Sequence, residues 1–461
     1  MLTRSQVFKI VLLALVLLLI YTSLPRKPLN NLINERIKTM SRKVPKVEEA
    51  EAVRIITTGD RKDIDALAEY ARVQITQPRA PNNLYELGMR LRILKKFISI
   101  GREEGELYEY LKSQIFPWAH KQPKLSAYQG AGKESKGIVI CTGNEYFKFV
   151  VHSIRNIRLV HNCTLPIEVF YIGESDLSPD KRTYLSTLDG VSVRDITSVF
   201  DQNILKLNGW DAKPFSMLAS TFSQTLLLDA DTVLLQSPDV LFSDSGYQAD
   251  GALFFHDRTL FPTDNFKREW LQSLFPRPFS SRLQARRFFQ LKTSYEQEAG
   301  AVLIDKSRRL AGLLAACALN NRPERESVIH HETHGEKETF WLGFEMLSEP
   351  YAFMPSMPGA IGTIERDHDK PSQQVVCGKL CHFDRQGRPL WFNDSISAGK
   401  KDKELSNEAS RLTHFTKEGK WNPFLCLSGK EFEELNDSEL VTLERSVKVF
   451  IPDPLKTMPK K

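Results

Sequence analysis

The pattern of apolar and polar residues divides the chain into segments of different character. An almost wholly apolar run, IVLLALVLLLIYTSL at residues 10–24, precedes a polar, charged stretch to about residue 58 that has no sustained periodicity and is typical of a flexible stem. Between residues 60 and 118, apolar residues such as Leu84, Leu87 and Leu91 recur at helical spacing, which predicts amphipathic helices. Residues 120–137 are expected to form a linker.

From residue 137 on, β-branched apolar runs alternate with segments of helical spacing. GIVICTG (137–143), LPIEVFYIG (165–173) and VSVRDI (191–196) are predicted strands, with a helix between the first two. A helix that opens at Lys213-Pro214 leads into the strand TLLLD (225–229), and the strand GAVLID (300–305) precedes the helix RRLAGLLAACAL (308–319). Strands that alternate with helices predict an α/β fold with a largely parallel central sheet.

The apolar run near the N-terminus is interpreted as a membrane anchor. Basic residues flank it, and no small-x-small cleavage site stands near residues 21–24, so an uncleaved anchor is favoured over a cleaved signal peptide. A short tail before the run and a long body after it favour a single-pass type II arrangement with a luminal body. The short span suits a thin early-secretory or Golgi membrane, so we expect the Golgi membrane.

Composition and charge narrow the classes of partner. The chain has 461 residues, of which 41% are hydrophobic and 26% charged, as in ordinary globular proteins. Its 63 basic and 57 acidic residues give a net charge of +6 and are spread along the chain, unlike the concentrated basic face of a nucleic-acid binder. We therefore expect no nucleic-acid partner. Six cysteines in a luminal body would be free to form disulfides, with 15 possible pairings.

The candidate chemistry starts from LLLDADTVLLQ at residues 226–236, which places Asp229 and Asp231 in an apolar run. On an extended strand these two carboxylates would share one face, at the strand end where α/β sheets bind ligands. Because a buried unpaired carboxylate is costly, a cation is expected to meet them. The pair would then either cap a turn and meet an arginine, or hold Mg²⁺ or Mn²⁺ against the diphosphate of a nucleotide sugar.

The same residues also fit the D-x-D-x-[TV] pattern of haloacid-dehalogenase-like phosphatases, with Asp229 as nucleophile and Asp231 as general acid. Those phosphatases usually carry the pattern on their first strand, whereas three predicted strands precede it here. No clear acidic pair follows at a later strand end. A luminal phosphatase therefore remains the alternative enzyme, and a catalytically silent glycan-binding relative is the alternative outside enzymes.

Over residues 137–393 the chain resembles the fungal Golgi α-1,3-mannosyltransferase family. The resemblance rests on GIVICTG, TLPIEVFYIGESDLS, GWDAKPFSMLASTFSQTLLLDADTVLLQSPDVLF, EAGAVLIDKSR, GEKETFWLGFEM and HFDRQGRPLWFND, in this order. It implies a GT-A-type fold, GDP-mannose as donor, a mannose-terminated glycan on glycoproteins as acceptor, Mn²⁺ (or Mg²⁺) as cofactor, and retention of the α configuration. Asp229 and Asp231 would bind the metal and the donor diphosphate.

Four further residues are site candidates on the matching motifs. His382 in CHFD resembles a third metal ligand, with a structural histidine as the alternative, and Lys213 would favour phosphate at a helix N-terminus unless it is a solvated surface lysine. Glu298 and Glu336 are the candidates for a catalytic nucleophile or positioning group. Their alternatives are loop solvation for Glu298 and helix capping for Glu336, where family members more often have Asp.

These interpretations give a domain organisation. Residues 1–9 would be a cytoplasmic tail, 10–24 a transmembrane signal anchor, 25–130 the stem and helical region, and 131–461 the luminal glycosyltransferase domain. WNPFLCL at residues 421–427 is expected to dock on the core of that domain.

Overall fold

The computed structural model describes residues 79–457, except 120, 123, 133, 261, 277, 397–411, 423 and 424. All of these belong to one compact unit that begins at Ala52. The predicted tail (1–9), anchor (10–24) and stem (25 to about 58), and the first part of the predicted helical region, lie outside the described residues. Within the described part, no helix combines the length and apolar character needed to cross a bilayer.

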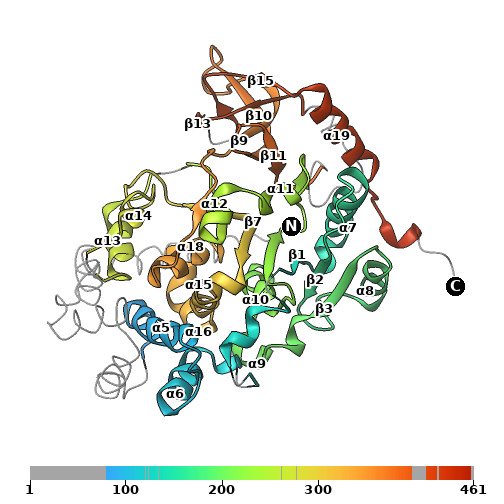
Figure 1. Cartoon of the computed structure of the whole chain (residues 1–461). Coiled ribbons are helices and arrows are strands. Elements are labelled where there is room, and N and C mark those ends of the chain that lie inside the picture. The colour runs from blue at the N-terminus through green and yellow to red at the C-terminus, as the bar shows by residue number, and fades with distance from the viewer. Residues whose placement is uncertain are drawn as a thin grey trace, which may run out of the picture. The chain divides into compact units, whose positions relative to one another are not determined.

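A seven-stranded sheet forms the centre of the unit (Figure 1). Its order is β3 (Val191–Asp195), β2 (Ile167–Tyr171), β1 (Lys136–Cys141), β4 (Gln224–Leu228), β7 (Gln297–Asp305), β6 (Ala252–His256) and β8 (Ala352–Phe353). The first four strands are parallel, and so are β6 and β8, whereas β7 is antiparallel to both of its neighbours. The predicted α/β fold with a largely parallel central sheet is confirmed, with the strand GAVLID, part of β7, as its one antiparallel member.

Helices cover both faces of this sheet. One face packs against α10 (Ala212–Ala219), α15 (Lys306–Leu319) and α18 (Lys337–Met346). The other face contributes Ile138, Ile140, Leu226 and Leu228 to a buried core shared with α7 (Phe147–Arg155) and α8 (Pro179–Ser186). Residues at alternate positions of β1 and β4 thus supply the same core, as the period of two in a strand requires. All five residues of β4 are buried.

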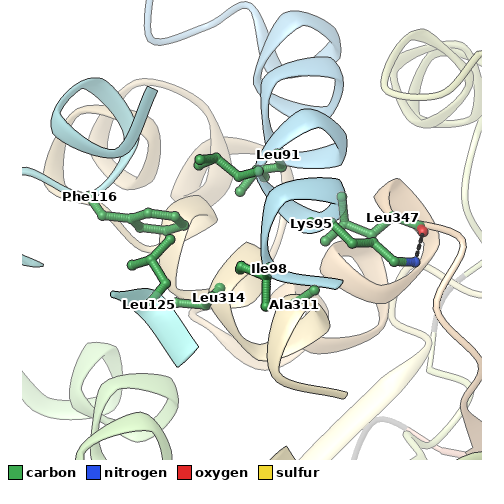
Figure 2. A pocket seen from close by; sticks show the side chains of 9 residues that line it. Leu91, Lys95, Ile98, Phe116, Leu125, Ala311, Leu314 and Leu347 are labelled. Carbon is green, nitrogen blue, oxygen red and sulfur yellow. Dashed lines mark hydrogen bonds between the residues drawn. The ribbon is translucent and has the colours of Figure 1, made fainter. Parts of the chain in front are cut away.

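The remaining helices are short or peripheral. They are α5 (Leu84–Ser99), α6 (Glu106–Ile115), α9 (Gln202–Leu205), α11 (Asp239–Phe242), α12 (Ser245–Asp250), α13 (Asn265–Ser273), α14 (Ser281–Gln284), α16 (Arg322–Glu324), α17 (His330–Glu332) and α19 (Asp437–Lys448). The helices predicted before residue 118 are confirmed as α5 and α6. Between α5 and α15 lies a small pocket with an almost wholly apolar lining, where Lys95 Nζ donates to Leu347 O at 2.9 Å (Figure 2). This pocket has no convergent polar groups and is a gap in helix packing.

A second sheet of eight strands was not predicted. Its order is β13 (Lys420–Trp421), β14 (Leu427–Ser428), β10 (Gln374–Phe383), β9 (Gly359–Arg366), β12 (His414–Thr416) and β15 (Glu433–Glu434), with β11 (Pro389–Phe392) pairing with β10 and with β5 (Val233–Leu234). Because β5 directly follows the aspartate pair, this second sheet is tied to the loop that carries the candidate site. The expected docking of WNPFLCL is confirmed at its two ends, where Trp421 in β13 pairs with Leu427 in β14.

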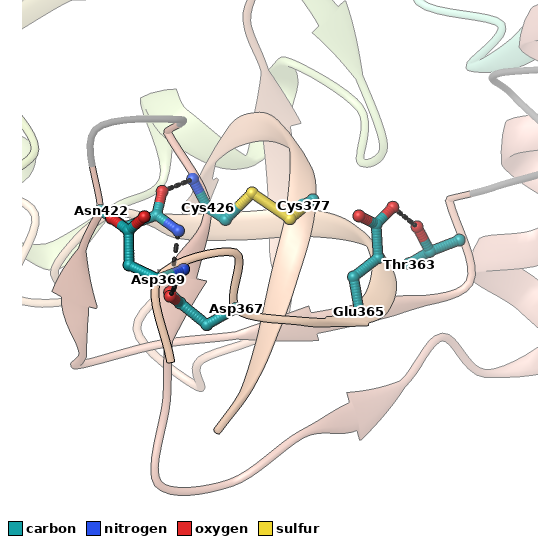
Figure 3. Close-up of a disulfide and its surroundings, with 7 residues drawn as sticks. All are labelled: Thr363, Glu365, Asp367, Asp369, Cys377, Asn422 and Cys426. Atoms are coloured by element: carbon teal, nitrogen blue, oxygen red, sulfur yellow. Dashed lines mark hydrogen bonds between the residues drawn. A yellow bond between two sulfur atoms is a disulfide. The ribbon is translucent and has the colours of Figure 1, made fainter. Parts of the chain in front are cut away.

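One disulfide fastens the second sheet. Cys377 on β10 is bonded to Cys426 next to β14, and Asn422 Nδ2 donates to Asp367 Oδ2 at 2.9 Å beside it (Figure 3). Of the other cysteines, Cys163, Cys317 and Cys381 are buried thiols.

Candidate active site

Asp229 and Asp231 lie in the turn between β4 and β5, at the carboxyl end of the central strand. The Asp229 N–H donates to Gly300 O on β7 at 3.0 Å, and Thr232 N donates to Asp229 O at 3.1 Å to close the turn. Ser395 N, beyond β11, donates to Asp231 O at 2.9 Å. The predicted location at a strand end is confirmed. The expectation that both aspartates sit on an extended strand is wrong, because the chain turns immediately after Leu228.

A lysine meets this pair. α10 begins at Ala212, so Lys213 lies inside its first turn and not just before the helix. Its Nζ lies 2.6 Å from Asp229 Oδ1 and 3.0 Å from Glu336 Oε1. Burial alone would lower the pKa of Lys213, but the two carboxylates raise it well above its usual value. Lys213 is therefore a buried cation of the site, and the solvated-surface alternative is wrong.

Glu336 occupies the N-cap position of α18, yet its side chain makes no capping hydrogen bond. It is 3% exposed and binds Lys213, so the helix-capping alternative is wrong. Burial raises the pKa of Glu336, and the neighbouring Lys213 ammonium acts in the opposite direction. The structure thus joins Lys213, Asp229 and Glu336, which belong to three different elements, in one ion cluster.

Glu298 on β7 belongs to an adjoining cluster. Its Oε1 accepts from Gly300 N at 3.1 Å, and burial together with the nearby Asp257 carboxylate raises its pKa to about 7. Lys337 Nζ lies 2.6 Å from Asp257 Oδ2 and favours the ionised form of Glu298. Asp229 also acts on the pKa of Glu298, so the two clusters are in electrostatic contact. Simple loop solvation of Glu298 is therefore wrong.

Asp257, Lys337 and Cys141 were missed in the sequence. Lys337 stands beside the candidate Glu336, and Asp257 and Cys141 each stand at the end of an apolar run, which was the available signal. The Cys141 Sγ donates to Ser216 Oγ at 3.1 Å, and burial raises the pKa of Cys141 to about 12. Cys141 thus contributes a protonated thiol to the surroundings of Lys213.

His382 lies on β10, opposite Trp391 on β11. The two rings are stacked with their centroids 4.0 Å apart, and the Phe255 ring lies 5.4 Å from His382. Burial lowers the pKa of His382 to about 3, so its imidazole is neutral. Its buried Nε2 has no hydrogen-bond partner in the described part of the chain. A neutral imidazole with an unpaired nitrogen has the chemistry of a metal ligand.

The three predicted metal ligands are nevertheless not assembled. In the ranges that the structure describes, no group of three His, Cys, Asp or Glu side chains is placed to hold a metal ion. The physical reason at His382 is its flat stacking against Trp391, which holds the ring in an aromatic core. The structure thus joins Asp229 with Lys213 and Glu336, and leaves the ligand role of His382 a prediction.

The centre as a whole is rich in negative charge. It contains four carboxylate side chains and two lysines, Asp229, Asp257, Glu298 and Glu336 against Lys213 and Lys337, and Asp231 follows in the same turn as Asp229. Oxygen ligands of this kind suit Mg²⁺ or Mn²⁺. The donor set at Asp229 and Asp231 therefore fits a hard divalent cation that would offset the excess charge.

The chain was compared with known proteins. The family model described as "Mannosyltransferase putative" matches residues 135–384. Alpha-1,3-mannosyltransferase MNN1 of Saccharomyces cerevisiae is 24% identical over 76% of this chain and 51% of its own length. Alpha-1,3-mannosyltransferase MNT3 of the same yeast is 26% identical over 53% of this chain and 42% of its own length. The chain spans about half the length of the curated relatives that it matches.

Among solved structures, core-mannan synthase A from Aspergillus fumigatus, in an Mn/GDP form, is 8% identical with a TM-score of 0.32, over 48% of this chain and 73% of that one. A likeness at this level carries no conclusion. The family model, in contrast, covers more than half of the chain and includes Lys213, Asp229, Asp231, Glu298, Glu336 and His382. The chain belongs to this mannosyltransferase family.

Proposed function

We propose that this chain is a GT-A-type glycosyltransferase that transfers mannose from GDP-mannose to a mannose-terminated glycan of a glycoprotein. The reaction would use a divalent cation, form an α-1,3 linkage and retain the configuration of the transferred mannose. The observation that carries the proposal is the aspartate pair at the carboxyl end of β4, in an acidic centre and within the range that matches the family. This is the edge at which α/β sheets bind their ligands.

Asp229 and Asp231 would hold Mn²⁺ or Mg²⁺, with His382 as the proposed third ligand. The bound cation would supply Lewis-acid stabilisation for the negative charge that develops on the departing diphosphate. Lys213 Nζ lies 2.6 Å from Asp229 Oδ1, so it holds this carboxylate in place, and it adds a positive charge for phosphate oxygens. Glu336 in turn orients the Lys213 ammonium.

Glu298 and Glu336 are the carboxylates that we propose for nucleophile or positioning roles in catalysis. A pKa of about 7 lets Glu298 exchange a proton near neutral pH, which suits a group that accepts a proton from an attacking hydroxyl. Glu336 is held in its charged network with Lys213 and Asp229 and suits a positioning role. Retention can proceed through a carboxylate nucleophile or through same-face attack assisted by the diphosphate, and these residues allow both routes.

We also propose a single-pass type II protein of the Golgi membrane, with residues 1–9 cytoplasmic, 10–24 as anchor, 25–130 as stem and helical region, and 131–461 as the luminal catalytic domain. The Cys377–Cys426 disulfide supports an oxidising compartment, because structural disulfides are rare in the cytosol. Digestion of sealed Golgi vesicles with protease should leave the domain from residue 131 intact until detergent is added.

The test of activity is release of GDP from GDP-mannose by the purified chain, with Mn²⁺ or with EDTA, and with or without an α-mannoside acceptor. We expect acceptor-stimulated release that EDTA abolishes and that Asp231→Ala lowers at least a hundredfold. Asp369→Ala is the matched control, because this aspartate side chain is 58% exposed, in the loop between β9 and β10. Equal rates in Asp231→Ala and wild type, or no release under any condition, would refute the proposal.

A further inference from the structure

Trp210 is a large apolar side chain that the fold does not bury. Its exposed fraction is 54%, and it is the aromatic member of the few large hydrophobic side chains that are exposed in the described residues. It stands in the 3₁₀ turn η6 (Gly209–Asp211), directly before α10 and three residues before Lys213. An indole that stays in solvent beside a charged site requires an explanation, because its burial would stabilise the fold.

Buried ion pairs of the neighbouring Asp211 hold the turn that carries Trp210. Asp211 is 6% exposed, and its carboxylate lies 3.1 Å from Arg325 Nε and 3.3 Å from His330 Nε2. Arg325 also donates to the carbonyl oxygens of Leu205 and Lys206 at 3.1 and 3.0 Å. Trp210 is therefore exposed on a rigid support, which lowers the entropic cost of using it in binding.

Trp210 begins a row of rings that leads to the acidic centre. Its ring centroid lies 5.6 Å from that of His334, and His334 lies 6.1 Å from Tyr295. Lys337 Nζ lies 4.2 Å from the centroid of Tyr295 and binds Asp257. Gly335, with φ +66°, brings the backbone next to the indole, since a Cβ added there would lie 3.1 Å from Trp210 Cε3. The next residue along the chain is Glu336.

This combination of groups is suited to a pyranose. The less polar face of a sugar packs on an aromatic ring, and carboxylates at the rim accept hydrogen bonds from its hydroxyls. The exposed end of the row suits an acceptor in particular, because an acceptor glycan stays attached to a bulky protein and must approach from solvent. A nucleotide base could also stack on an indole, and separate KM values for the two substrates distinguish these two ligands.

We propose that Trp210, with His334 and Tyr295 behind it, forms the platform on which a mannose residue of the acceptor glycan stacks, and this proposal rests on the proposed mannosyl transfer. Asp257 and Glu298 lie at the inner end of the row, where they would meet the hydroxyl groups of the sugar that reacts.

The first test measures KM separately for the two substrates in Trp210→Ala, Trp210→Phe and the wild-type chain, with α-mannobiose as acceptor. Loss of the stacking ring should raise the acceptor KM about tenfold, while the KM for GDP-mannose and the acceptor-independent release of GDP stay within about twofold. Trp210→Phe should restore most of the affinity. Val441→Ala on α19 is the matched control, because Val441 is also 54% exposed.

A rise in the KM for GDP-mannose with no change for the acceptor would overturn the proposal in favour of a base-stacking role. Unchanged values for both substrates would also overturn it, and would leave the proposed transfer intact. Equal melting temperatures of the variants and the wild type exclude a folding defect.

The second test separates binding from catalysis. Tryptophan fluorescence is titrated with α-mannobiose in EDTA, where Trp210 should dominate the response because Trp118, Trp270, Trp341 and Trp391 are buried and Trp421 is half-buried. We expect a saturable change in the wild-type chain that Trp210→Phe removes. A saturable change in a chain that releases no GDP would refute the transfer and support the platform. No sugar-dependent change in the wild-type chain would overturn the platform.

Discussion

The replacement Lys213→Met tests whether the buried ion cluster is organised as described. Methionine is similar in length to lysine but carries no charge, so the variant removes the ammonium group that lies 2.6 Å from Asp229 and 3.0 Å from Glu336. Two carboxylates would then face each other without a cation, and Glu336 is only 3% exposed.

The size of the effect follows from the cost of breaking a buried ion pair. Removal of one partner from such a pair costs about 3–5 kcal/mol, because the remaining charge stays buried without compensation. With an unfolding entropy of about 2.1 cal/mol/K per residue over roughly 380 residues, a loss of 4 kcal/mol lowers the melting temperature by about 5 °C.

The loss of stability should depend on pH. Burial already raises the pKa of Glu336, and removal of Lys213 takes away the charge that opposes this shift. A carboxyl group whose pKa is higher in the folded than in the unfolded state lowers the free energy of unfolding when it is ionised. The effect is complete at pH values above its folded pKa and absent below its unfolded pKa of about 4.5. The gap in melting temperature between Lys213→Met and wild type should therefore be larger at pH 8 than at pH 5.

The assay is a set of thermal melts, followed by circular dichroism, at pH 5 and pH 8. The double variant Lys213→Met/Glu336→Gln should recover part of the loss at pH 8, since it removes the buried charge left behind. A difference below about 1 kcal/mol at pH 8, or one that is the same at both pH values, would refute the ion cluster as a buried network.

Three further predictions can be checked by the same melts. In the wild type, a folded pKa of about 7 for Glu298 should make the free energy of unfolding fall between about pH 4.5 and pH 7. Glu298→Gln should flatten this fall. Profiles of melting temperature against pH that coincide for variant and wild type would contradict the raised pKa. Cys426→Ser removes the disulfide between residues 49 positions apart and should lower the free energy of unfolding by about 4 kcal/mol. Dithiothreitol should lower the melting temperature of the wild type but not of this variant. Gly335→Ala, at φ +66° and against Trp210, should cost about 1–2 kcal/mol and alter the Trp210 emission spectrum; an unchanged spectrum would show that the turn does not pack on the indole.

Most of the central sheet was accessible from sequence, because β1, β2, β4 and β7 are buried on both faces and appear as apolar runs between helical segments. The second sheet was not, since strands such as β13, β14 and β15 have only two residues each and carry no measurable alternation. The pairing of Cys377 with Cys426 depends on that sheet.

The site was accessible in part for a similar reason. Asp229 and Asp231 stand out because they interrupt an apolar run. The ion-pair partners of Lys213 could not be predicted. Asp229 and Glu336 come from separate elements, and only the tertiary fold brings them to within 3.0 Å of the Lys213 ammonium. Sequence spacing also favoured capping for Glu336, and only the tertiary contact with Lys213 decides against it.

The direction of β7 explains why Glu298 and Asp257 lie near Asp229. Leu228 at the end of β4 pairs with Ala301, and because β7 runs antiparallel, residues that precede Ala301 lie beyond the end of β4, beside Asp229. Glu298 is therefore at the carboxyl edge of the sheet. β6 is antiparallel to β7 in turn, so its last residue, His256, and the following Asp257 reach the same edge. A parallel β7 would have sent Glu298 to the opposite edge, so the one reversed strand is what makes Glu298 a residue of this site.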